Sequence, residues 1–318
     1  MMKIAILDDV QDVVKNLSCY ELLQQHEVKV FSSSARGLGQ LAIRLAPFDA
    51  LVLIRERTAF PGALLQKLPN LKVISQTGKV SGHIDMQAAG ELGIAVLEGI
   101  GDPTAPAELT WALIMAAMRK VPQYSTYLRQ GLWQVSSLDP VRNTLGFSLK
   151  GKTLGIWGLG KIGQMVAGYG QAFGMRVLVW GSEASRQRAV QMGYLAAQSK
   201  EQFFSEVDVV SMHLRLNEAT RNVVLKDDLA RLKPTALFVN TSRAELVEQG
   251  ALLEAAARGQ PIAVDVFDTE PLTQGEPLLG FPNVLATPHL GYVEQHSYEI
   301  YFRAAFQNLV DFARQQNL

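Results

Sequence analysis

Cysteine is almost absent from this sequence of 318 residues, because Cys19 is the only one. A single thiol excludes an internal disulfide and a metal site built from cysteines, and it favours a reducing compartment. An excess of one charge is also absent, since 30 basic residues balance 30 acidic ones. The sequence therefore gives no sign of a surface for nucleic acid or for an anionic membrane. We expect no metal centre, no nucleic-acid partner and no membrane partner.

Long hydrophobic runs are missing as well. The longest, Trp111–Met118, is far shorter than a membrane span. The N-terminal apolar stretch, Met1–Leu7, is short and is followed at once by Asp8 and Asp9, which is unlike a signal peptide. We therefore expect a cytoplasmic protein, and its length allows about two domains of roughly 100–200 residues each.

A glycine-rich turn is the most informative feature that the sequence does contain. Residues Gly158–Gly163 read Gly-Leu-Gly-Lys-Ile-Gly and follow a short apolar stretch, Thr153–Trp157, that is typical of a buried strand. Behind the turn, apolar residues recur at helical spacing as far as Gly174, where a helix would end. A strand, such a turn and a helix, in that order, indicate a dinucleotide site.

The glycines have separate tasks in such a site. The first permits the tight turn, the second lets the backbone approach a pyrophosphate, and the third lets the helix pack on the strand. Unpaired N–H groups at the start of the helix then face the phosphates. The residues expected to bind the cofactor here are Gly158, Gly160, Lys161, Ile162 and Gly163.

Short apolar stretches alternate with helical ones along most of the chain. This alternation predicts βαβ units and parallel sheets, so the expected fold class is α/β with two doubly wound domains. A loop is expected over Gln130–Leu149, ahead of the glycine turn. The predicted strands are Lys3–Leu7, Val28–Phe31, Ala50–Ile54, Lys72–Gln76, Thr153–Trp157, Arg176–Trp180, Asp208–Met212, Ala236–Asn240, Ile262–Val266 and Asn283–Thr287; the predicted helices include Val10–Gln25, Ala35–Leu45, Pro106–Lys120 and Tyr298–Leu318.

Three ionisable residues, Arg243, Glu270 and His289, come just after predicted strands in the second half. Ligands of open parallel sheets bind beyond the carboxyl ends of the strands. Taken singly, these residues are more often a surface salt bridge, a solvated charge and a capped loop histidine. The repeated arrangement on successive strands favours a site instead.

These residue types match the transfer of a hydride to or from a 2-hydroxy acid. The hydroxyl must lose or gain a proton, and histidine titrates in the useful range. A paired carboxylate orients the imidazole and favours its charged form. An arginine fork holds an anionic substrate with two hydrogen bonds. We therefore expect Arg243, Glu270 and His289 to be the catalytic residues.

With Gly158–Gly163, the stretches Asn240–Ala244, Ala263–Phe267 and Pro288–Gly291 occur in a specific order and spacing. These stretches show that the sequence resembles the D-isomer-specific 2-hydroxyacid dehydrogenase family, and the resemblance extends over nearly the whole chain. The resemblance implies that Arg243 binds the substrate carboxylate, that His289 is the acid and base, and that Glu270 supports it. It also implies that Asp265 contacts the nicotinamide end of the cofactor.

The resemblance further implies the architecture. A flavodoxin-like substrate domain would comprise residues 1–104 and 292–318, and a Rossmann cofactor domain would be inserted as residues 105–291. Members of the family are usually dimers through the cofactor domain, so a homodimer is expected. His213 and Thr241 are expected to join the cofactor contacts.

The loop that receives the substrate carboxylate in the family departs from the usual pattern here. Gln76 stands where the family has an arginine, and Lys79-Val80 stands where a small apolar residue and a glycine are usual. We expect Gly78 and Lys79 to contact the substrate. A solvated loop lysine is an equal alternative for Lys79.

The end of the second Rossmann strand departs as well. NAD enzymes place an acidic residue there to bind the ribose 2′-hydroxyl, but this chain has Gly181, followed by Ser182. Without that carboxylate a 2′-phosphate is not repelled, and Arg186 and Arg188 could bind one. Glu183 could bind the ribose instead, so the expected cofactor is NAD or NADP.

A pair of arginines, Arg55 and Arg57, follows the third predicted strand. Phosphoglycerate dehydrogenases of the family have a similar pair that is implied to meet the substrate phosphate, although an exposed charged loop is an equal alternative. The sequence therefore indicates an NAD(P)-dependent enzyme for a small anionic 2-hydroxy or 2-keto acid, with 3-phosphoglycerate as a candidate substrate. A glyoxylate or hydroxypyruvate reductase is the alternative, and a cofactor-sensing protein similar to transcriptional co-repressors is the alternative from another class.

Overall fold

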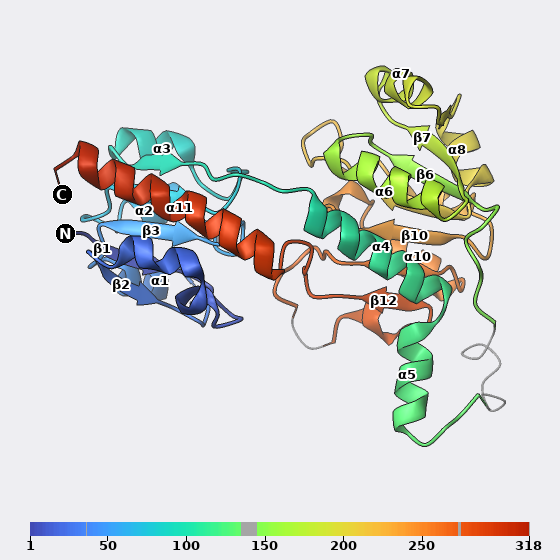
Figure 1. The fold of residues 1–318 in the computed structure, drawn as a ribbon, viewed down its shortest axis with the longest axis horizontal. Coiled ribbons are helices and arrows are strands. Elements are labelled where there is room, and N and C mark those ends of the chain that lie inside the picture. Colours follow the sequence, from blue (N-terminus) through green and yellow to red (C-terminus); the bar gives the residue numbers. More distant parts are fainter. Residues whose placement is uncertain (36, 135–144, 273–274, 318) are drawn as a thin grey trace. The chain divides into compact units, whose positions relative to one another are not determined.

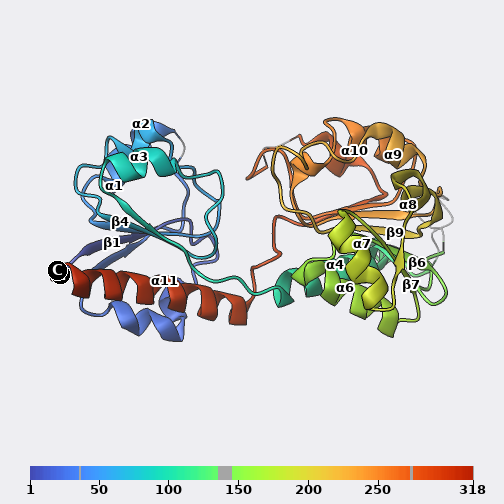
Figure 2. The same cartoon turned by 90° about the horizontal axis from the view of Figure 1, so that it is seen from above.

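The computed structural model describes residues 1–318 apart from 36, 135–144, 273–274 and 318. The chain divides into two compact units, which are Met1–Asp102 with Val293–Leu318, and Pro103–Tyr292. Each unit is a parallel sheet with helices on both faces (Figures 1 and 2), which confirms the expected α/β class. Over the described ranges, no helix is long and apolar enough to cross a membrane.

The sheet of the first unit has the strand order β2-β1-β3-β4-β5, which is the flavodoxin-like order. Its central strands are buried along their whole length, as expected of parallel strands covered on both faces. Figure 2 shows α1, α2 and α3 on one face of this sheet and α11 on the other. The elements are β1 (Lys3–Ile6), β2 (Glu27–Val30), α1 (Leu38–Leu45), β3 (Ala50–Leu53), α2 (Gly62–Leu65), β4 (Val73–Gln76), α3 (Met86–Glu91), β5 (Ala95–Leu97) and α11 (Gln295–Gln315).

The predicted helix Val10–Gln25 is wrong. This segment forms two 3-10 turns, η1 (Val14–Asn16) and η2 (Ser18–Leu23), with an extended residue, Leu17, between them. Side-chain carboxylates bind the first amide of each turn and so keep the two turns from joining into one helix. Asp9 accepts a hydrogen bond from the amide of Val14 at 2.9 Å, and Glu299 accepts one from the amide of Ser18 at 2.6 Å. Tertiary contacts therefore override the helical spacing.

The sheet of the second unit has the order β12-β11-β10-β9-β6-β7-β8, all parallel. In order of appearance within the unit, six of these strands follow the Rossmann order 3-2-1-4-5-6, and β12 extends the sheet by one. The strands are β6 (Thr153–Trp157), β7 (Arg176–Trp180), β8 (Leu195–Ala196), β9 (Val209–Met212), β10 (Leu237–Asn240), β11 (Ile262–Val264) and β12 (Val284–Ala286).

Successive residues of each central strand point to opposite faces of the sheet, and each face packs against its own hydrophobic core. Leu154 and Ile156 of β6 face the core beneath α4 and α6, whereas Trp157 packs with Phe203 and Phe204 on the opposite face. Figure 2 shows α8, α9 and α10 on that second face. The helices are α4 (Thr104–Met118), α5 (Val121–Arg129), α6 (Lys161–Ala172), α7 (Glu183–Gln191), α8 (Lys200–Glu206), α9 (Lys226–Ala230), α10 (Ala251–Ala257) and the 3-10 turns η3 (Ala244–Leu246) and η4 (Pro277–Gly280).

The ten predicted strands are all present, with ends that differ by up to two residues. Helix α11 begins three residues before the prediction, because the Glu294 carboxylate caps the amides of His296 and Ser297. The helix ends at Gln315, three residues before the predicted end, and Leu318 itself lies outside the described residues, as does part of the loop expected over Gln130–Leu149.

Candidate active site

The glycine-rich turn sits between β6 and α6, and its backbone leaves room for a phosphate. Gly158 has φ +99°, and a Cβ there would lie 2.6 Å from the carbonyl oxygen of His213. A Cβ on Gly163 would lie 2.1 Å from the carbonyl oxygen of Gly158, whereas one on Gly160 would meet open space. The first and third glycines are therefore required by packing, and the second leaves the turn accessible.

Helix α6 begins directly after this turn. Gly160 is its N-cap residue, so no side chain covers the helix start. The first hydrogen bond within the helix runs from the amide of Gln164 to the carbonyl of Gly160. The amides of Lys161, Ile162 and Gly163 consequently have no acceptor within the helix. Open donors beside an accessible glycine fit the pyrophosphate of a dinucleotide.

The end of β7 contains the residues expected to select the cofactor. Gly181 has φ +143°, which L-residues rarely adopt, and the Ser182 hydroxyl caps α7. Arg188 donates to the carbonyl of Leu159 at 3.0 Å and so braces the glycine-rich turn. Arg186 lies over the Trp180 ring, 5.1 Å from its centroid. Its buried Nε atom has no hydrogen-bond partner in the described part of the chain.

His213 and Thr241 lie at the carboxyl ends of β9 and β10. The His213 Nε2 atom is 2.9 Å from the Ser211 hydroxyl, and desolvation lowers the pKa of His213 to about 3. The ring is therefore neutral at physiological pH. The Thr241 hydroxyl is 2.7 Å from that of Thr110 on α4. Their contact with a cofactor stays a prediction.

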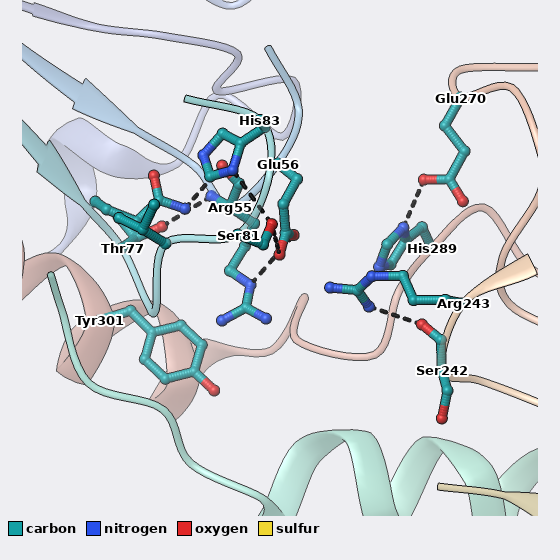
Figure 3. A network of polar contacts seen from close by, with 12 residues as sticks. Arg55, Glu56, Thr77, Ser81, His83, Ser242, Arg243, Glu270, His289 and Tyr301 are labelled. Carbon is teal, nitrogen blue, oxygen red and sulfur yellow. Dashed lines mark hydrogen bonds and ion pairs between the residues drawn. The ribbon is translucent and has the colours of Figure 1, made fainter. Parts of the chain in front are cut away.

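Arg243 is held by a tight turn that follows β10. The fully buried Asn240 side chain accepts the amide of Ser242 at 3.0 Å and donates to the carbonyl of Arg243 at 2.8 Å. The Ser242 hydroxyl donates to the carbonyl of Met212 at 2.7 Å, which ties the turn to β9. The Arg243 guanidinium donates to the Ser242 carbonyl at 2.7 Å (Figure 3).

His289 and Glu270 form a close pair. The His289 Nδ1 atom lies 2.5 Å from Glu270 Oε2 (Figure 3), and the other oxygen of Glu270 accepts the amide of Phe267 at 2.9 Å. Burial by itself raises the pKa of Glu270, but the His289 hydrogen bond and charge, the Phe267 amide and the charge of Arg243 together lower it below its ordinary value. Glu270 is therefore a carboxylate at neutral pH.

The loop that carries His289 is anchored by Asp265. This fully buried carboxylate accepts the Thr287 hydroxyl at 2.7 Å and the amides of Leu290 and Gly291 at 2.7 and 2.9 Å. Burial raises the pKa of Asp265. His289 itself has φ +53°, a conformation that must be held by its surroundings. The expected contact of Asp265 with nicotinamide stays a prediction, and the anchoring role was not foreseen from the sequence.

In the first unit, Arg55 lies against the loop after β4. Its Nη1 atom occupies the space that a side chain at Gly78 would fill, since a Cβ there would lie 2.3 Å away. The Arg55 Nε atom is 3.9 Å from Glu56 Oε2, and the Ser81 hydroxyl bonds the other oxygen of Glu56 (Figure 3). Within the described residues, the amides of Gly78 and Lys79 have no hydrogen-bond acceptor. A cation and two open amides thus lie together.

Arg57 and Lys79 are differently placed. The Arg57 guanidinium donates to the carbonyl of Asp8 at 2.6 Å, to the Gln11 side chain at 3.2 Å and to the Tyr298 hydroxyl at 3.3 Å. The Lys79 ammonium, whose side chain is 69% exposed, lies 2.7 Å from the Glu98 carboxylate. That bond and one from the Val80 amide lower the pKa of Glu98. The solvated alternative for Lys79 gains support from this pairing.

Comparison with known proteins gives a consistent result. A sequence profile described as "D-isomer specific 2-hydroxyacid dehydrogenase, NAD binding domain" matches residues 111–291. A glyoxylate reductase from Aeropyrum pernix is 38% identical over 255 residues, which cover 79% of this chain and 76% of that protein. A D-3-phosphoglycerate dehydrogenase from Methanocaldococcus jannaschii is 32% identical over 295 residues, which cover 92% of this chain and 53% of that protein, so this chain spans about half its length. The crystal structure of a phosphoglycerate oxidoreductase from Vibrio cholerae o395 is 57% identical, with a TM-score of 0.96 and coverage of 99% of this chain and 100% of that one.

Proposed function

Because the chain belongs to the D-isomer specific 2-hydroxyacid dehydrogenase family, whose members act on CH–OH groups with a nicotinamide cofactor, we propose that its own substrate carries a second anionic group, as 3-phosphoglycerate does. The observation that carries this proposal is Arg55, whose guanidinium lies against Gly78 beside two amides without an acceptor. A carboxylate alone would leave part of such an anion receptor unused.

We further propose the proton-transfer roles within the second unit. A bound nicotinamide would supply the hydride acceptor or donor for the substrate carbon, and the residues of the glycine-rich turn would hold the dinucleotide. The His289 Nδ1 atom faces Glu270, so Nε2, which has no partner among the residues described, is the atom that gives or takes the proton of the substrate oxygen. The Glu270 carboxylate stabilises the imidazolium, and Arg243 binds the substrate carboxylate and supports the developing charge.

The expected domain roles follow from these placements. The unit Pro103–Tyr292 has the glycine-rich turn and is proposed as the dinucleotide-binding domain, whereas the unit Met1–Asp102 with Val293–Leu318 has Arg55 and Gly78 and is proposed as the substrate domain. Arg57 and Lys79 are proposed as supporting residues, since each already has a protein partner.

A second candidate is a reductase for glyoxylate or hydroxypyruvate. The protein partners of Lys79 and Arg57 favour this candidate, because they leave less positive charge for a second anionic group. Glu98 offsets the charge of Lys79, and Arg57 is held by Asp8 and Gln11. The two candidates are separated by steady-state kinetics of the intact enzyme with 3-phosphoglycerate, hydroxypyruvate and glyoxylate, each with NAD(H) and NADP(H). The first candidate predicts the highest kcat/KM for 3-phosphoglycerate, and the second predicts it for an unphosphorylated 2-keto acid.

For the cofactor we propose that NADPH is accepted at least as well as NADH. No carboxylate follows β7 directly, and the Arg186 guanidinium over Trp180 offers a cation near Gly181. Glu183 is exposed and accepts a hydrogen bond from Gln187 at 3.0 Å, so it is already engaged on α7. Its engagement weakens the alternative that Glu183 binds the ribose.

We also propose a cytoplasmic homodimer formed through the cofactor domain. Helix α5 and the residues after it expose large apolar side chains, with Leu128 57%, Leu132 39% and Trp133 72% accessible. An exposed cluster of this kind is typical of a surface that a partner covers. Light scattering of the purified protein tests this directly, because a mass near 35 kDa instead of twice that value would contradict it.

A further inference from the structure

Gln76 and Thr77 are two buried polar residues at the end of β4 that the catalytic scheme does not use. Gln76 is 0% and Thr77 1% exposed. Both bind the main chain of Arg55, which follows the carboxyl end of the neighbouring parallel strand, β3. The Gln76 Nε2 atom donates to the carbonyl of Arg55 at 2.9 Å. The Thr77 hydroxyl accepts the Arg55 amide at 3.1 Å, and both residues are labelled in Figure 3. The peptide groups on both sides of the Arg55 Cα are thereby fixed.

The backbone that they fix is an unusual one. Arg55 has φ +52°, in the left-handed region, which residues other than glycine adopt only at a cost. Such a conformation persists only where the surroundings impose it. It turns the Arg55 side chain onto Gly78, where the guanidinium leaves no room for a Cβ.

Gln76 also has an uncompensated cost. Its Oε1 atom is buried without a hydrogen-bond partner in the described structure, which disfavours the folded state. An apolar side chain of the same length would avoid that cost, so stability alone does not explain a glutamine at position 76. The hydrogen bond that the Gln76 amide donates to the Arg55 carbonyl does explain the glutamine.

We propose that Gln76 and Thr77 are positioning residues for substrate recognition, which hold Arg55 in the left-handed conformation that presents its guanidinium as the anion receptor. This inference rests on the function proposed above for Arg55. It assigns a task to Gln76, which stands where the family places an arginine. In this chain the cation comes from Arg55, in the loop after β3, and the buried glutamine of β4 fixes its direction.

The test uses the intact enzyme and inorganic phosphate as the anion probe. The inhibition constant of phosphate against glyoxylate reduction is measured for the wild type, Gln76→Met, Thr77→Val, Arg55→Met and the double variant Gln76→Met/Arg55→Met. Thermal unfolding and the KM for cofactor are measured alongside. Gln87→Met on the exposed face of α3 is the matched control for the same substitution.

We expect Arg55→Met to weaken phosphate inhibition by roughly 10- to 100-fold and Gln76→Met or Thr77→Val to weaken it by about tenfold, as the loss of one hydrogen bond would. In the Arg55→Met background, Gln76→Met should add nothing. If Arg55→Met weakens inhibition but Gln76→Met and Thr77→Val do not, the positioning role is overturned and the role of Arg55 stands. If Arg55→Met has no effect, both fail. Equal losses from Gln76→Met in both backgrounds also overturn the inference, since they would indicate a general structural effect.

Discussion

The Nδ1 atom of His289 lies 2.5 Å from Oε2 of Glu270, and the second oxygen of that carboxylate is fixed by the amide of Phe267. The carboxylate therefore determines both the orientation of the ring and the nitrogen that remains for a substrate. Asp265 anchors the loop around the same histidine through Thr287, Leu290 and Gly291. This geometry supports the proton-transfer role that we propose for the pair.

Replacing the histidine tests the first role. His289→Ala should lower kcat by about 10²- to 10⁴-fold, the usual contribution of general acid–base catalysis, because no other group would move the proton. The dissociation constant of the cofactor, measured by fluorescence titration, should hardly change, since the glycine-rich turn is elsewhere in the unit. Near-normal turnover would remove His289 from the mechanism.

The pH profile tests the carboxylate. Glu270 has a lowered pKa, so its contribution to stability is fully present above its ordinary pKa and is lost as the pH falls through the lowered value. Glu270→Gln keeps a hydrogen-bond acceptor but removes the charge that favours the imidazolium. The acid limb of the pH profile, where protonation of Glu270 neutralises the charge that its lowered pKa preserves, should therefore be absent or shifted in Glu270→Gln. Glu91→Gln, on the exposed end of α3, is the control, and an unmoved limb in Glu270→Gln would contradict the pairing.

The substitution Arg243→Lys tests whether the planar guanidinium of Arg243 is required, or only its charge. Arg243→Lys keeps the charge but loses the planar fork, so KM for the substrate should rise and kcat should fall almost as far as in Arg243→Ala. The comparison of both variants in steady-state assays is the measurement. Recovery of most activity by lysine would show that a point charge is sufficient.

Cofactor choice is tested at the end of β7. An aspartate at Gly181 would need a backbone conformation that L-residues rarely adopt, so Ser182→Asp is the sharper variant, because aspartate also caps helices well. The added carboxylate should repel a 2′-phosphate and so raise kcat/KM with NADH relative to kcat/KM with NADPH. Arg186→Met should change this ratio in the same direction. A wild-type enzyme that strongly prefers NADH would instead point to Glu183 as the ribose ligand.

The sequence predicted the sheets well for a physical reason. Parallel strands are buried on both faces, so they read as continuous apolar runs, and the polar residues that follow them mark their carboxyl ends. Arg243, Glu270 and His289 were predicted as site residues in this way, and their catalytic role stays a prediction. The segment Val10–Gln25 failed because Asp9 and the distant Glu299 reshape it.

The orientation of the two arginines could not be read from the sequence. Arg55 and Arg57 have different partners, which are Gln76 and Thr77 in one case and Gln11 and Tyr298 in the other. Those partners are brought together by the order of strands in the sheet and by the return of α11 to the first unit. Such long-range contacts have no periodic signal.

The most direct test of the proposed function compares Arg55→Met with Arg57→Met on two substrates. The ratio of kcat/KM for 3-phosphoglycerate to that for hydroxypyruvate, each measured in its working direction, is determined for both variants and the wild type. We predict that Arg55→Met lowers this ratio by at least about tenfold, because only the phosphorylated substrate loses a charge-assisted contact. Arg57→Met should leave the ratio near the wild-type value while lowering the unfolding temperature, since its guanidinium holds Asp8, Gln11 and Tyr298. An unchanged ratio in Arg55→Met would contradict the account and leave a small 2-keto acid as the substrate.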